Sequence, residues 1–239
     1  MIAPRTVYRK LLAAYGPRGW WPVTSPRHRR PKYHPGRYDL PGPRAAFEIC
    51  AGAIMTQNTA WSNVVTALEL LRTEKVLEPR RILRLRDARL RRLIRSTGYF
   101  VQKAKKLKYF SRYALARRAS LSRRLRETPL PALREELLGI YGVGPETADS
   151  MLLYAGGRRS FVVDAYTKRI GMRLGWFTSG AGYHDIQDFL TARMPRSVKV
   201  YQELHALFVE LGKRACRTRP CCGSCPVRSG CPERRRRMR

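Results

Sequence analysis

Five of the six cysteines fall within the last twenty-four residues of the chain, and this clustering suggests metal chemistry. They occur in the segment CRTRPCCGSCPVRSGC as Cys216, Cys221, Cys222, Cys225 and Cys231. Four thiolates at short intervals suit an iron–sulfur cluster. A zinc site more usually has two Cys-x-x-Cys arms, and only one such arm is present. We therefore predict a 4Fe-4S cluster, with zinc as the alternative.

A second chemical feature is an aspartate that follows a glycine-rich turn. The stretch GIYGVGPETADS has Gly142 and Gly144 between two helices, and Pro145 suits the first position of the second helix. Exposed amides at that helix start could hold a DNA phosphate without reading a base, although an ordinary connector has the same pattern. About twenty residues later comes Asp164, either a helix N-cap or a carboxylate placed to meet a deoxyribose.

Together, these motifs resemble the helix-hairpin-helix DNA glycosylase superfamily, and endonuclease III most broadly. The resemblance covers about residues 44–231, with hairpin, aspartate and cysteines in the family's order. It implies that Asp164 is the essential aspartate. It also implies that Gln57, with Asn58 beside it in the stretch IMTQNTAW, is the wedge that replaces an extruded nucleotide. Otherwise Gln57 is simply a polar helix terminus.

The same resemblance selects the cluster ligands. The ligands that it implies are Cys216, Cys222, Cys225 and Cys231. Cys222 is preferred to Cys221 because it preserves the family's two-residue and five-residue intervals, although the first interval is then five residues where the family has six. Cys221 and Cys50 are predicted to be non-ligands.

Further stretches are similar to the 3-methyladenine DNA glycosylase III branch, namely GWWP, FEICAGAIMTQNT and TGYFVQKAKKL. The resemblance implies a base pocket walled by Trp20, Trp21 and Phe47. An alkylated purine carries positive charge, which an aromatic face attracts, although aromatic residues more often belong to a core. Two departures are the cysteine cluster, which that branch lacks, and Leu207, which stands where the branch has a pocket lysine.

The predicted reaction is base removal at Asp164, with Glu146 as the second predicted catalytic-site residue. Scission of an N-glycosidic bond builds positive charge on the sugar, which a carboxylate stabilises. Strand cleavage would need an amine to form a Schiff base, and Glu146 stands where bifunctional relatives place a lysine. We therefore predict a monofunctional DNA glycosylase acting on an alkylated purine such as 3-methyladenine, although Glu146 also suits a first helical turn.

Three alternatives stay open. They are a bifunctional glycosylase and AP lyase for oxidised pyrimidines, a mismatch thymine or uracil glycosylase, and a non-enzymatic DNA-binding scaffold that keeps the hairpin and the cluster.

The charge of the chain indicates its partner. Lys plus Arg number 49 against 17 Asp plus Glu, a net charge of +32 over 239 residues. Such a surplus favours a nucleic-acid partner, although a general arginine bias of the source gives the same composition. The family resemblance implies that this partner is double-stranded DNA containing a damaged base. The predicted DNA contacts are Gln57, Asn58, Gly142, Gly144, Lys103 and Lys168.

No apolar run approaches the ~20 residues of a membrane span, and the N-terminus lacks the features of a secretory signal. We expect a cytoplasmic monomer with no membrane partner, associated with the nucleoid if the source is prokaryotic.

Helical periodicity predicts an all-α protein. Two short helices are expected around a break near Asp87, followed by a helix in VQKAKKLKYFSRYALARRA with its lysines outward. Later helices are expected at about 165–175, 183–193 and 198–214. Within the first 43 residues, the stretch GPRGWWPVTSPRHRRPKYHPG is too broken by proline for long regular structure, and only RSFVVDA has strand character.

The resemblance implies a two-lobed helix-hairpin-helix glycosylase fold. Residues 44–157 would form a six-helix barrel lobe ending in the helix-hairpin-helix at 133–155. Residues 1–43 and 158–231 would form the cluster lobe, and 232–239 a basic tail. DNA would lie across the cleft between the lobes, bringing Gln57, Glu146 and Asp164 together.

Overall fold

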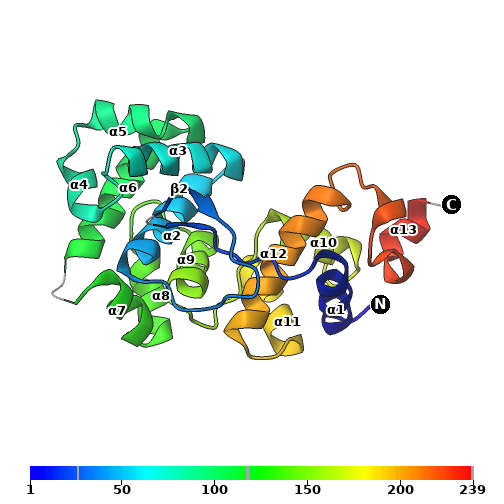
Figure 1. The fold of residues 1–239 in the computed structure, drawn as a ribbon. Coiled ribbons are helices and arrows are strands. Elements are labelled where there is room, and N and C mark those ends of the chain that lie inside the picture. The colour runs from blue at the N-terminus through cyan, green and yellow to red at the C-terminus, as the bar shows by residue number, and fades with distance from the viewer. Residues whose placement is uncertain (26, 117–118, 238–239) are drawn as a thin grey trace. The chain divides into compact units, whose positions relative to one another are not determined.

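The protein is built almost entirely of helices, with one two-stranded sheet in the part of the chain described (Figure 1). The structure is a computed structural model that describes residues 1–25, 27–116 and 119–237. The predicted all-α class is confirmed. Among the described helices, none is both long and apolar enough to cross a membrane. The chain divides into two compact units, each described by itself below.

The first unit, called the hairpin unit, comprises residues 21–34 and 38–158. Residues 21–34 and 38–43 were expected to belong to the lobe of the terminal segments. In the structure they belong to the same unit as the helices that follow them. The elements of this unit are β1 (Val23–Ser25), β2 (His28–Lys32), α2 (Pro43–Thr56), α3 (Trp61–Thr73), α4 (Pro79–Arg84), α5 (Asp87–Leu93), the 3₁₀ turn η1 (Arg95–Thr97), α6 (Phe100–Leu115), α7 (Leu121–Glu127), α8 (Leu130–Leu138), α9 (Pro145–Ser150) and the π-helical turn η2 (Met151–Ala155).

Helix α2 forms the core of the hairpin unit. Its residues from Ala46 to Met55 are all buried, so every face of the helix is covered. The helices packed against it include α3, α6, α7 and α9. A helix that is apolar all round can be stable only in such an enclosed position.

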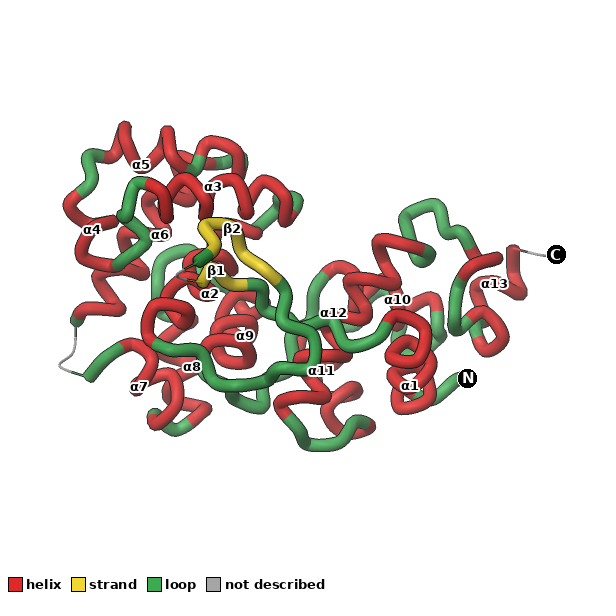
Figure 2. Tube along the Cα trace, in the orientation of Figure 1, coloured by secondary structure: helices red, strands yellow, loops and turns green. Residues whose placement is uncertain are grey.

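Two short strands correct the expectation that only RSFVVDA has strand character. Strands β1 and β2, yellow in Figure 2, pair antiparallel with Val23 opposite Lys32 and Ser25 opposite His28. The segment RSFVVDA, expected to have strand character, forms no strand in the described structure. Phe161, Val162 and Val163 are instead buried in an extended connection before a helix. Their apolar character reflects burial, which periodicity cannot distinguish from a buried strand in so short a run.

An ion pair holds together the two helices of the hairpin. Arg134 on α8 donates from Nε to Asp149 Oδ1 at 2.9 Å and from Nη2 to Oδ2 at 3.2 Å, and Asp149 on α9 is fully buried. The ion pair therefore ties α8 to α9 on the two sides of the hairpin turn.

The second unit, called the cysteine unit, comprises residues 1–20, 35–37 and 159–239. Most residues of the helix at Val198–Arg214 are buried. This helix passes close to the one that begins after Asp164, because a Cβ added at Gly212 would lie 2.1 Å from the Tyr166 side chain. The helices expected near 165–175, 183–193 and 198–214 are confirmed. The elements are α1 (Pro4–Tyr15), α10 (Ala165–Arg173), α11 (Tyr183–Arg193), α12 (Val198–Arg214), the 3₁₀ turns η3 (Cys222–Ser224) and η4 (Arg228–Gly230), and α13 (Pro232–Arg237).

Candidate functional site

Asp164 stands at the N-terminus of α10 in the cysteine unit. Its Oδ1 accepts the backbone N–H of Thr167 at 2.7 Å, so the side chain does cap the helix. Its Oδ2 lies 3.5 Å from Nε2 of His205, and the side chain is 12% exposed. The N-cap bond therefore uses one carboxylate oxygen, and the other oxygen faces an imidazole.

The surroundings of Asp164 keep it ionised. Burial raises the pKa of the Asp164 carboxyl, but the hydrogen bond and charge of His205 and the N–H of Thr167 lower it by more, so that the pKa lies below its usual value. Asp164 is thus a carboxylate anion at neutral pH. Such a group can stabilise positive charge that develops nearby.

His205 is a site residue that the sequence did not reveal. It lies on α12, is 4% exposed, and meets the ring of Trp20 edge-on with centroids 5.6 Å apart. The neighbouring Glu203 holds the segment before Trp20 by accepting the N–H of Arg18 at 2.9 Å. Helix α12 thus positions both Trp20 and Asp164. In ELHALFVEL a histidine shares the apolar face with leucines, which is usually a core position, so only the tertiary contacts single it out.

The three aromatics predicted to wall a base pocket have different environments. Trp20 is half-buried beside His205. Trp21 belongs to the hairpin unit, where its ring packs at 5.3 Å against both Trp61 and Tyr154. Phe47 is 3% exposed and stacks on Phe110.

Two of these aromatics are buried and the third is half-buried. Trp21 and Phe47 pack among the rings of the hairpin unit, whereas Trp20 keeps part of its ring exposed. The role of pocket wall stays a prediction for all three.

Gln57 lies against the hairpin turn. Its Nε2 donates to the carbonyl oxygen of Gly142 at 2.9 Å and to Thr147 Oγ1 at 3.0 Å, while Lys106 Nζ donates to its Oε1. The next residue, Asn58, is exposed and has a positive φ of 52°, a conformation that asparagine tolerates. The structure thus brings the predicted wedge and the predicted phosphate-binding turn together within one unit.

The two hairpin glycines, Gly142 and Gly144, differ in whether the fold itself requires a glycine at that position. Gly142 has φ +80°, and a Cβ there would meet the Lys106 side chain at 2.5 Å. Gly144, the N-cap of α9, is extended, and a Cβ there would meet no described atom within 4 Å. Gly142 is therefore required by the chain itself, whereas Gly144 leaves open space beside the first turn of α9, where Glu146 is exposed.

Of the two lysines predicted to contact DNA, one is exposed and one is buried. Lys168 is exposed on α10. Lys103 is 2% exposed, and its Nζ donates to the carbonyl oxygens of Met55 at 2.9 Å and Thr97 at 2.6 Å. Burial, with a smaller effect of Lys106, lowers the pKa of Lys103 to about 8. This corrects the prediction for Lys103, which bonds backbone at the end of α2 instead of facing solvent.

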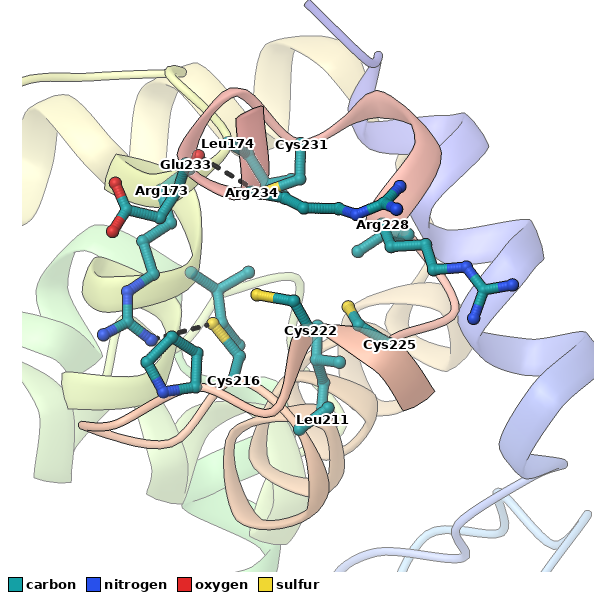
Figure 3. Close-up of a pocket in the computed structure, with 14 residues that line it drawn as sticks. Arg173, Leu174, Leu211, Cys216, Cys222, Cys225, Arg228, Cys231, Glu233 and Arg234 are labelled. Atoms are coloured by element: carbon teal, nitrogen blue, oxygen red, sulfur yellow. Dashed lines mark hydrogen bonds between the residues drawn. The ribbon is translucent and has the colours of Figure 1, made fainter. Parts of the chain in front are cut away.

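Four cysteines line one hollow of the cysteine unit (Figure 3). They are Cys216, Cys222, Cys225 and Cys231. Arg173 donates from Nη1 to Cys216 Sγ at 3.3 Å, and Cys231 Sγ donates to the Arg173 carbonyl oxygen at 3.5 Å. Cys221 is exposed and is not among the residues that line the hollow.

The chemistry of these thiols fits a bound cation. Burial raises the pKa of Cys225, and the neighbouring thiols at 216, 222 and 231 raise it further. A metal would relieve this repulsion by binding the thiolates. Within the described residues, no three His, Cys, Asp or Glu side chains converge closely enough to hold a single metal ion. The sulfurs surround a space instead of meeting at one point.

Known proteins are similar to this chain in sequence or in fold. A family model described as "HhH-GPD superfamily base excision DNA repair protein" matches residues 51–196. The chain is 38% identical over 226 residues to a Methanocaldococcus jannaschii protein described as a "putative DNA repair glycosylase", with 94% of each chain covered.

Two solved structures are also similar. The H. pylori 3-methyladenine DNA glycosylase, bound to 1,N6-ethenoadenine, matches with a TM-score of 0.63 and 26% identity over 74% of this chain and 90% of that one. A non-covalent complex of endonuclease III with DNA matches with a TM-score of 0.77 over 100% of this chain and 99% of that one, and at 19% identity it shows a shared fold.

Proposed function

Because this chain belongs to the HhH-GPD superfamily of base excision DNA repair proteins and is a DNA glycosylase, we propose that it is monofunctional and removes an alkylated purine such as 3-methyladenine. The observation that carries the proposal is the ionised carboxylate of Asp164 beside His205. The substrate class is supported by the half-buried indole of Trp20 against His205 and by the similarity to the H. pylori enzyme.

The proposed reaction is hydrolysis of the bond between C1′ of the deoxyribose and the base nitrogen. The bond breaks with its electron pair going to the base, and positive charge develops on the sugar. Asp164 stabilises that charge, a water oxygen then bonds to C1′, and the carboxylate takes the water's proton. An alkylated purine is cationic and leaves as a neutral base, so protonation of the leaving group is not required.

Glu146 supports the absence of a lyase step. It occupies the first turn of α9, is exposed, and has no amine with which to attack C1′. A Schiff base with the sugar requires such an amine. In this proposal the product is an intact abasic site.

The hairpin unit supplies the proposed DNA contacts. The open space at Gly144 lets a phosphate approach the backbone at the start of α9. Gln57, bonded to Gly142 and Thr147 of the same hairpin, is proposed to fill the gap left by the extruded nucleotide. In the cysteine unit, exposed Lys168 is proposed to contact the backbone.

Cys216, Cys222, Cys225 and Cys231 are proposed to hold a 4Fe-4S cluster. A single zinc with Zn–S bonds of about 2.3 Å needs its four sulfurs within about 4 Å of one another, whereas a four-iron cluster fills a space between the sulfurs. The four cysteines line a shared hollow, and within the described residues no three metal-binding side chains converge on a single point, which favours the second arrangement. The cluster would hold the C-terminal loop in place and take no part in base release.

Base release from a panel of duplexes tests the function. The panel carries methylated purines, oxidised pyrimidines, uracil, or a thymine mismatch, and each reaction is repeated with borohydride, which traps a Schiff base. We expect release of the methylated purine and no trapped adduct, because Glu146 cannot form the imine. A bifunctional glycosylase on its own substrate is the positive control for trapping. Release of oxidised pyrimidine with trapping would establish the bifunctional alternative, and no release from any duplex would favour a scaffold.

His205 is proposed to position the Asp164 carboxylate and to lower its pKa. In His205→Leu the pKa of Asp164 is expected to rise, since the hydrogen bond and charge that lower it are gone. The acid limb of the pH–rate profile should therefore move to higher pH. His205→Gln, which keeps a donor, should recover most of the shift. The measurement is single-turnover base release from about pH 4 to pH 9.

An exposed histidine of the same unit provides the matched control. His184 lies on α11, and His184→Leu is expected to leave the profile unchanged. An unshifted acid limb in His205→Leu would show that His205 has only a packing role.

A further inference from the structure

A polar hollow lies beside the hairpin turn, within the hairpin unit. Its empty volume is about 910 Å³, including space open to solvent. Residues of α5, of α6 and of the hairpin turn line it, and they are Asp87, Arg91, Val101, Gln102, Ala104, Lys105, Lys108, Tyr109, Arg112 and Tyr141. The hollow reaches the hairpin turn, because Tyr141 lines it and directly precedes Gly142.

The hollow is strongly cationic. Arg91, Lys105, Lys108 and Arg112 line it against one carboxylate, Asp87. Asp87 is already paired, since Lys108 donates to it and Arg91 lies 3.8 Å away. No carboxylate of the described residues forms an ion pair with Lys105 or Arg112. The charge of Arg112 also acts on Asp87, but four cations outnumber this one carboxylate, so the hollow keeps a net positive charge for an anionic ligand.

Lys105 and Arg112 each lie over the ring of an exposed tyrosine. Lys105 Nζ is 4.5 Å from the centre of the Tyr141 ring, and Arg112 Cζ is 5.3 Å from that of Tyr109. The tyrosine rings contact each other at 5.0 Å and are 42% and 41% exposed. Stacking on the rings restricts the long cationic side chains, so less conformational entropy is lost when they bind an anion. The Tyr141 hydroxyl donates to Gln102 Oε1 at 3.2 Å, and the Tyr109 hydroxyl at the same surface is a further hydrogen-bond donor.

We propose that this hollow is a second phosphate-binding site, which holds the backbone of the same DNA strand beyond the phosphate at the hairpin. Lys105 and Arg112 each neutralise one phosphate, and the tyrosines position them. The proposal rests on the proposed DNA binding by the hairpin, but it concerns affinity and not base release. Phosphate contacts of this kind fix the register of a protein on DNA without reading its sequence.

The test compares salt dependences of binding to a lesion-containing duplex. Each phosphate contact contributes about 0.9 to the slope of log K against log salt. The double variant Lys105→Gln and Arg112→Gln is therefore expected to lower that slope by about 1.8 and to weaken binding at low salt by about tenfold or more. The matched control is Arg123→Gln with Arg126→Gln on α7, which removes the same charge from exposed positions outside the hollow.

The outcomes separate this site from the glycosylase itself. Base release at saturating DNA should equal wild type in the double variant, whereas failure of the proposed function would appear as no release by wild-type protein. Equal slopes for the double variant and wild type would overturn the proposal, as would an equal loss in the α7 control, which would indicate a general charge effect. Inorganic phosphate that shifts the wild-type melting temperature, with DNA binding unaltered by the substitutions, would identify a free-anion site instead and would also overturn it.

Discussion

Asp164→Asn is expected to bind lesion-containing DNA as tightly as the wild type and to release the base about 10²–10³-fold more slowly, because removing one preorganised electrostatic contact costs this much. Asparagine also caps helices well, so the hydrogen bond to Thr167 and the start of α10 should survive. The variant thus removes the negative charge while keeping the fold. Single-turnover base release and a binding titration measure the two effects separately.

A second helix-capping aspartate provides the control for this result. Asp185 at the start of α11 accepts the N–H of Gly182 at 2.9 Å and is exposed. Asp185 lies in the same unit as Asp164, but among the described ion pairs His205 contacts Asp164 and not Asp185. Asp185→Asn should therefore leave base release unchanged. Base release by Asp164→Asn at the wild-type rate would show that another group stabilises the transition state.

The second large effect is expected for Cys222→Ser, in contrast with Cys221→Ser. Cys222 lines the hollow with three other thiols, and loss of one ligand should remove the iron and sulfide together with the brown colour. Cys221 is exposed and outside the hollow, so Cys221→Ser should keep all of them. Because metal binding to such a loop contributes directly to folding, Cys222→Ser should also melt at a clearly lower temperature.

Metal content decides between the outcomes for the two cysteine variants. Iron and acid-labile sulfide are counted per chain after purification without oxygen, and zinc is measured in parallel. If the wild-type protein contains zinc and no iron, the four cysteines hold a zinc ion and not an iron–sulfur cluster. Loss of iron in Cys221→Ser, with retention in Cys222→Ser, would reverse the ligand assignment.

The helical frame could be predicted from the sequence because its signals are local. The bounds expected near 183–193 and 198–214 agree with α11 and α12, since apolar spacing and helix ends are set by neighbouring residues. Lys103 shows where such reasoning stops. Its place among outward lysines was the natural expectation, but two carbonyl groups at the end of α2 and before Gly98 draw its ammonium inward.

Aromatic residues show the same limit. Adjacent Trp20 and Trp21 cannot both enter one core, and the sequence indicates this much without saying which ring is buried. The structure places Trp21 against Trp61 and leaves Trp20 beside His205. No spacing rule links residues 20 and 205, because they are neighbours only after the chain has folded.

By itself, the sequence determined the chemical types of the site: a carboxylate at a helix start, glycines at a turn, a glutamate without an amine, and cysteines at short intervals. Each of these depends on a few adjacent residues, for which backbone geometry and ligand spacing are nearly local properties. Only the tertiary structure decided the partners. It set His205 against Asp164 and Gln57 against the hairpin turn, because the environment of a side chain depends on segments distant in sequence that pack against it.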